Sequence, residues 1–203
     1  MKKFNLLLIS VSYLFIINHC FGQTKIHESK ELKSGIYLTH NEFKNNAPSI
    51  DFEYEVSAKT RRYGLLGIGG KIIYYRINID KKKAKQLGKV YGFCDGSNVY
   101  INPEMLKFYP KTEFSKIEYL NKLSYFEDIL CTTTFNPNNS TTSTSCSLAR
   151  KIVNIDNGEV TVLTKKSLRN LISDNPQLLN RFENESRKNK KLKDYFLEYM
   201  NSL

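Results

Sequence analysis

The chain has 203 residues, a net charge of +11 and a mean hydropathy of −0.44. Its 12 Phe and 13 Tyr, with many Ile and Leu, argue against intrinsic disorder, and the length suits one domain with a buried core. The positive charge would suit nucleic acid, but the export signal described next argues against a nucleic-acid partner.

Residues 1–22 have the pattern of a signal peptide. Two lysines precede an apolar run at residues 6–17, and Cys20-Phe21-Gly22 offers small residues for cleavage before Gln23. The run is shorter than the roughly 20 residues that span a bilayer, although an uncleaved anchor is an alternative. Acylation of Cys20 is a second alternative, which the poor lipoprotein motif before it disfavours. We therefore predict an exported protein that is periplasmic, on the cell surface or secreted.

The first half of the mature chain predicts short strands and one short helix. Residues 23–34 are polar and read as a loose lead-in to a strand at 35–38. Thr39 and Glu42 form a capping box that opens a helix. Residues 51–57 and 71–79 alternate apolar and polar side chains, which is typical of half-buried strands. A glycine-rich, apolar connection at 64–70 joins them.

The second half predicts a meander of strands followed by helices. Asp95-Gly96 and Asn157-Gly158 are strong hairpin signals between apolar runs. The tract 136–145 is of low complexity and reads as a loop. After residue 164 the apolar period becomes helical. We expect a single α+β domain over residues 23–203, an antiparallel meander sheet with short helices and a C-terminal helical segment packed on one face.

Three cysteines remain after signal removal: Cys94, Cys131 and Cys146. An odd number in an oxidising compartment suggests one disulfide and one free thiol. A hairpin that turns at Asn138 and Asn139 places Cys131 opposite Cys146, close enough for the sulfur atoms to bond. We therefore predict a Cys131–Cys146 disulfide, with two free buried thiols as the alternative.

No catalytic, cofactor or metal motif is complete. Leu65 and Ile72 stand where a phosphate-binding loop needs Gly and Ser or Thr. The mature chain has only two histidines, too few for a histidine zinc site. Cys94 would need a base such as His40 to act as a nucleophile, and nothing in the sequence joins them. We expect a buried structural role for Cys94, and a bulged strand in the glycine-rich stretch, with an apolar flap as the alternative.

Several segments resemble a known pattern. The run from Gly35 to Ser49 resembles a "GxY-T-xx-EF-xx-N-x-PS" opening, and residues 92–102 resemble a "GF-x-DG-xx-VYIN" hairpin. With residues 157–166, these segments resemble an uncharacterised family of exported proteins from Gram-negative bacteria. The resemblance implies a periplasmic or surface location and no catalytic residue.

Three functions can be compared. We expect a non-enzymatic envelope protein that binds or scaffolds an envelope protein or polymer, without a cofactor. A hydrolase of envelope polymers, using Glu53, Glu55 or Asp95, is the second hypothesis. Association with an anionic lipid surface, through the basic and aromatic last helix, is the third. The expected partner surface consists of Tyr54, Tyr74, Leu65, Leu66 and Ile68, to which Tyr37, Tyr91 and Tyr100 could add, with core packing as the competing role of each tyrosine.

Overall fold

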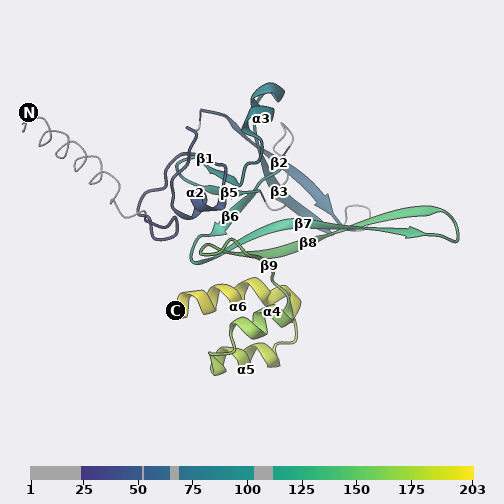
Figure 1. The fold of residues 1–203 in the computed structure, drawn as a ribbon. Coiled ribbons are helices and arrows are strands. Elements are labelled where there is room, and N and C mark those ends of the chain that lie inside the picture. The colour runs from purple at the N-terminus through teal and green to yellow at the C-terminus, as the bar shows by residue number, and fades with distance from the viewer. Residues whose placement is uncertain (1–23, 52, 65–68, 103–111) are drawn as a thin grey trace, which may run out of the picture.

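The computed structural model describes residues 24–51, 53–64, 69–102 and 112–203. Within them, seven strands form one antiparallel sheet in the order β1-β4-β5-β6-β7-β8-β9, and β2 and β3 form a separate ribbon (Figure 1). From β4 to β9, neighbours in the sheet are also neighbours in the chain. The fold is thus the predicted α+β meander.

The elements have the following bounds. The strands are β1 (Gly35–Tyr37), β2 (Val56–Tyr63), β3 (Gly70–Ile77), β4 (Gly92–Cys94), β5 (Val99–Ile101), β6 (Ser115–Tyr119), β7 (Leu123–Asn136), β8 (Thr141–Asn154) and β9 (Val160–Val162). The helices are α2 (His40–Lys44), α3 (Lys81–Leu87), α4 (Lys165–Leu171), α5 (Pro176–Asn184) and α6 (Lys188–Ser202). None of these helices is long and apolar enough to cross a bilayer.

Successive side chains of β7 and β8 point to opposite faces of the sheet, as the pleat requires. Tyr125 and Ile152 pack with the C-terminal helices, where Phe196 of α6 is fully buried. Phe126 and Val153 pack on the opposite face, in a second core cluster with α2. Helices α4, α5 and α6 therefore cover one face of the sheet, as the sequence predicted (Figure 1).

The β2–β3 ribbon has its own core against the first strands of the sheet. Ile77 packs there with Phe93 and Phe114, and Tyr75 pairs with Phe114 through an isolated bridge. Strand alternation predicted β3 and only the first two residues of β2, and it does not say which sheet a strand joins. The ribbon is thus a feature that only the structure provides.

The strand predicted at residues 51–57 is mostly absent. The ladder of β2 begins at Val56, which lies opposite Ile77 at the end of β3. The Glu55 carbonyl still accepts the Asn78 N–H (2.8 Å), but residues 53–55 belong to none of the described strands, and Tyr54 packs against the third core cluster. The alternation here thus reflects side-chain packing rather than a paired strand.

The lead-in is ordered rather than loose over its described part, 24–34. Ile26 is fully buried, and its N–H donates to the Lys44 carbonyl (2.8 Å). The Lys25 ammonium contacts Asp156 at 2.7 Å. Ile26 and Leu32, the two apolar residues of this part, both pack in the second core cluster and hold the otherwise polar segment on the core.

The loop predicted at residues 136–145 is wrong for most of its length. Only the turn at 137–140 lies outside a strand, and β8 begins at Thr141. Serine and threonine are common in loops, but threonine is also a strand former, and residues 141–145 pair with the β7 residues 132–136. Cross-strand pairing therefore overrides the loop-like composition.

Candidate functional site

Strands β7 and β8 extend beyond the strands that flank them (Figure 1). β6 pairs with β7 only as far as Phe126, and β9 pairs with β8 only from Lys151 onward. Among the described strands, residues 127–136 and 141–150 are therefore paired in a ladder only with each other. We call this projecting hairpin, residues 127–150, the arm.

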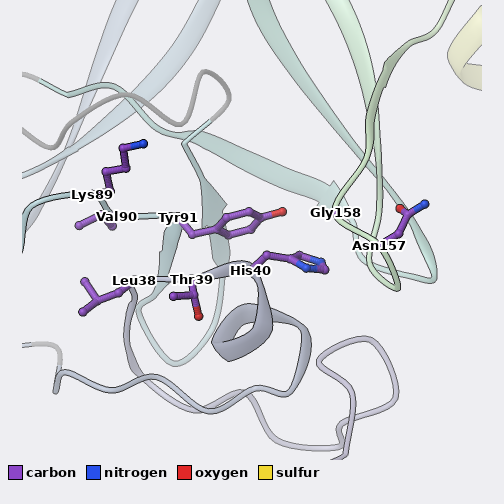
Figure 2. A pocket seen from close by; sticks show the side chains of 8 residues that line it. All are labelled: Leu38, Thr39, His40, Lys89, Val90, Tyr91, Asn157 and Gly158. Carbon is purple, nitrogen blue, oxygen red and sulfur yellow. The ribbon is translucent and has the colours of Figure 1, made fainter.

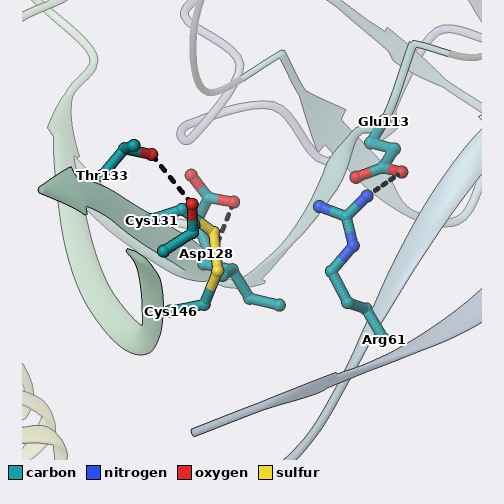
Figure 3. Close-up of a disulfide and its surroundings, with 8 residues drawn as sticks. Arg61, Glu113, Asp128, Cys131, Thr133 and Cys146 are labelled. Atoms are coloured by element: carbon teal, nitrogen blue, oxygen red, sulfur yellow. Dashed lines mark hydrogen bonds and ion pairs between the residues drawn. A yellow bond between two sulfur atoms is a disulfide. The ribbon is translucent and has the colours of Figure 1, made fainter. Parts of the chain in front are cut away.

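A disulfide joins the two strands of the arm (Figure 3). Cys131 lies directly opposite Cys146 in the register, and their sulfur atoms are bonded, which confirms the predicted pairing. The bridge closes a segment with a sequence separation of 15, for which loop-closure entropy gives about 3 kcal/mol. The arm is thus a covalently fixed hairpin.

The outer edge of β8 already has partners. In an antiparallel pair, alternate residues point both backbone groups away from the partner strand. On β8 these are the even-numbered residues, because the Gly64 N–H donates to the Cys146 carbonyl (2.8 Å) and the Leu163 N–H to the Arg150 carbonyl (2.7 Å). The ribbon and the segment after β9 thus occupy parts of this edge.

The outer edge of β7 is open along the arm. Because Cys131 faces Cys146, the outward residues of β7 are the odd-numbered ones. The Ile129 N–H donates to the Asp128 carboxylate (2.7 Å). Beyond it, the backbone groups of Cys131, Thr133 and Phe135 have no hydrogen-bond partner within the described residues. We call these three positions the β7 edge.

Beyond Glu127, Asp128 and Arg150 at its base, the arm is largely exposed and carries no charge. Residues 129–149 contain no charged side chain, in a chain of which 25% is Asp, Glu, Lys or Arg. Leu130 is 51% exposed and Phe135 is 63% exposed. Edge strands usually carry charges or proline that prevent pairing with other chains, and this edge carries neither. The uncharged run is the sequence signal that could have identified the arm, and our sequence analysis treated part of it as a loop.

The base of the arm is charged and well paired. Arg61 and Arg76 both bond to Glu113, at 2.6 and 2.8 Å, and Figure 3 shows the first of these contacts beside the disulfide. The Tyr74 ring lies under both guanidinium groups, about 5 Å from each. The predicted partner residue Tyr74 is therefore already held by cations of its own ribbon.

The other residues of the predicted partner surface do not form one patch in the described structure. Tyr54 is half-buried beside Lys83. Tyr37, Tyr91 and Tyr100 are buried in the core, so the expectation that they could add to a surface is wrong. Leu65, Leu66 and Ile68, the apolar residues of the glycine-rich connection, lie outside the described residues.

A cavity of about 350 Å³ lies between the start of α2, the segment before β4 and the β8–β9 turn (Figure 2). His40 contributes its ring, but its Nε2 is bonded to the Ile155 carbonyl (3.0 Å). The Tyr91 hydroxyl is enclosed without a hydrogen-bond partner among the described residues, and burial raises its pKa to about 12. Among the described residues, the lining of this cavity includes no carboxylate.

The residues considered for catalysis are buried or already hydrogen-bonded. Cys94 is fully buried, its sulfur accepts the Gly96 N–H (3.3 Å), and burial raises the pKa of the thiol. Asp95 is partly buried, which would raise its pKa. The Ser97 and Asn98 amides and the Tyr100 hydroxyl donate to its carboxylate, however, and hold that pKa below its usual value.

The two glutamates and the metal-ligating residue types give no site either. Glu53 and Glu55 are exposed, and Glu55 accepts from the Asn78 amide. Within the described ranges, no group of three or more His, Cys, Asp or Glu side chains could hold a metal ion.

The sequence matches a family of unknown function, DUF6563, over residues 35–203. The chain belongs to this family. The match begins at β1 and ends with the last residue, so it includes the whole meander, the arm and the C-terminal helices. No curated protein and no solved structure matches the chain.

Proposed function

We propose that this protein is an exported, non-enzymatic binding module that binds a protein partner by strand addition to its arm. The observation that carries the proposal is the β7 edge, whose outward backbone groups have no partner in the described structure. A strand added to such an edge gains main-chain hydrogen bonds, and exposed side chains such as Phe135 add specificity.

The alternatives have less support. The acidic residues considered for a hydrolase share no cleft in the described structure; they are Glu53, Glu55 and Asp95. The Asp95 carboxylate is hydrogen-bonded within its own turn. Lipid association would use the last helix, but Tyr195, Phe196 and Tyr199 of α6 are buried against the sheet. The exposed face of α6 carries Asp194 and Glu198 as well as lysines, and Lys191 is paired with Asp194.

Export is supported by the pattern of residues 1–22 and by the disulfide, since such bonds persist in oxidising compartments. N-terminal sequencing of the protein from cells that produce it naturally tests this part. We expect the mature chain to begin at Gln23. A chain that retains residues 1–22 and stays in the cytoplasm would contradict export.

Site-specific photo-crosslinking in intact cells tests the binding role. A photoreactive phenylalanine analogue at Phe135 should give a discrete crosslinked species. The same analogue at Leu203, which is also exposed but lies at the end of the chain, is the matched control. No discrete species from Phe135, or equal species from both positions, would refute a role of the arm.

A further inference from the structure

We infer that the strand added to the β7 edge is β7 of a second copy of this chain. The inference rests on the proposed function, because it names the partner of the same edge. It predicts a symmetric dimer in which the two arms lie antiparallel and each copy contributes the same residues.

Charge favours this partner. Each mature copy carries a net charge of +9, because residues 1–22 contain two of the 31 basic residues and none of the 20 acidic ones, and this charge opposes self-association over most of the surface. Residues 129–149 are the exception, because they carry no charge and project from the body. A different partner attracted by a basic protein would be acidic, and residues 129–149 contain no cation to receive it. The arm is therefore suited to meet its own copy.

The pattern of outward backbone groups fixes the register. A twofold axis at Thr133 places Thr133 opposite Thr133 of the second copy, and Cys131 opposite Phe135 of the second copy. All three outward positions of the β7 edge then form hydrogen-bonded pairs, while Ile129 keeps its contact with Asp128. A shift by one position toward Thr132 would place Phe135 opposite Ile129 and would require the Ile129 N–H, which Asp128 already accepts.

The same register keeps the charged bodies apart. At about 3.3 Å per residue, Phe126 of one copy lies roughly 45 Å from Phe126 of the other. This separation exceeds the Debye length of about 8 Å at physiological ionic strength several-fold. Repulsion between the two bodies is therefore screened, and the contact itself contains no charge to screen.

Two proline substitutions at facing positions test the inference. Thr133 and Thr144 lie opposite each other, and their hydroxyl groups share one hydrogen bond (3.1 Å), so either change loses the same side-chain contact. Thr133→Pro removes an outward N–H from β7, and Thr144→Pro removes an outward N–H from β8. Proline is tolerated where the N–H of an edge strand faces solvent. Circular dichroism and an intact disulfide would show that both variants fold.

Sedimentation equilibrium of the mature, oxidised protein is the measurement. We expect a dimer whose dissociation constant rises at least about tenfold in Thr133→Pro, because each copy loses a hydrogen bond at the axis, and changes less than about twofold in Thr144→Pro. We also expect the dimer to persist as salt is raised. Equal effects of the two prolines, or a dimer that salt dissociates, would overturn the inference.

A wild-type protein that stays monomeric up to about 100 μM would overturn it too, since weak homodimers form in this concentration range. The crosslinking result then decides the proposed function separately. A Phe135 crosslink to a different protein would leave the binding role in place and refute only the second copy. The absence of any Phe135 crosslink would refute both.

Discussion

The body of the molecule and its arm are built from the same two strands but are stabilised differently. In the body, β7 and β8 lie between two core clusters, and residues such as Tyr125 and Phe126 are fully buried. In the arm, the same strands have exposed side chains, one ladder and one disulfide. The body is therefore stabilised by burial of apolar surface, and the arm by backbone pairing and a covalent bond.

This difference separates folding from binding. A substitution in the arm removes little buried surface, so it should change association without unfolding the protein. A substitution in the body should do the reverse. The predictions below compare the two regions, from the largest expected effect to the smallest.

Truncating a body aromatic should have the largest effect. Phe196 is fully buried and its ring packs near Tyr119 and Tyr125, so it joins α6 to the sheet. Phe196→Ala should lower the free energy of unfolding by about 3–5 kcal/mol, through lost burial and the cavity left behind. Urea denaturation measures it. A loss below about 1 kcal/mol would mean that the helices are not part of the cooperative core.

Removing the disulfide should act on the arm. In the Cys131→Ser, Cys146→Ser double variant, the free energy of local opening should fall by about 3 kcal/mol, the loop-closure entropy of the bridge. Hydrogen exchange followed by mass spectrometry should show faster exchange in residues 132–145. The β4–β5 hairpin is the internal control, and equal acceleration there would contradict an independently opening arm.

Acidification should affect the body and spare the arm. Burial lowers the pKa of His27, with nearby Lys25 acting in the same direction and Glu28 opposing them. As the pH falls, His27 is protonated in the unfolded chain before it is protonated in the folded chain. The folded state therefore loses stability as the pH falls below about 6.5, the ordinary pKa of histidine. His27→Phe should reduce this loss in thermal unfolding between pH 7.5 and 5.5.

The arm supplies the control for this pH effect. Residues 129–149 contain no group that titrates in this range, because their only cysteines are joined in the disulfide. Their exchange, corrected for its intrinsic pH dependence, should therefore not respond. If His27→Phe left the loss of thermal stability between pH 7.5 and 5.5 unchanged, a group other than His27 would be responsible for that loss.

The smallest effect on stability should come from the exposed arm phenylalanine. Phe135→Ala should change the free energy of unfolding by less than about 0.5 kcal/mol, because the side chain is 63% exposed. The same variant should weaken self-association, since Phe135 lies at an outer position of the β7 edge. Urea denaturation and sedimentation measured on one preparation compare it directly with Phe196→Ala. Lost stability with unchanged association would contradict the division between arm and body.

Local sequence patterns predicted much of this fold because they report local chemistry. Asp95-Gly96 and Asn157-Gly158 do form tight turns, with Gly96 and Gly158 at positive φ, and Thr39 does cap α2, although the Glu42 carboxylate accepts the Leu38 N–H rather than that of Thr39. The disulfide followed from counting outward from a turn. These predictions needed only turn geometry, capping and strand alternation.

The remainder depended on contacts distant in sequence. Ile26 is buried because it meets a core that its polar neighbours do not reveal, and residues 141–145 become a strand because β7 lies opposite. The candidate site was missed for the same reason. The arm has an unpaired edge because β6 and β9 end before it, and the sequence of the arm does not show where those neighbouring strands end.

The burial of Cys94 has a consequence for how the protein matures. Three thiols allow three pairings, but Cys131 and Cys146 are close in sequence and face each other, whereas Cys94 is enclosed in the β4–β5 hairpin. With its pKa raised and its sulfur inaccessible, this thiol is a poor nucleophile for exchange. Once folded, the molecule cannot scramble its own bridge. It should therefore keep one disulfide pairing without the help of a disulfide isomerase.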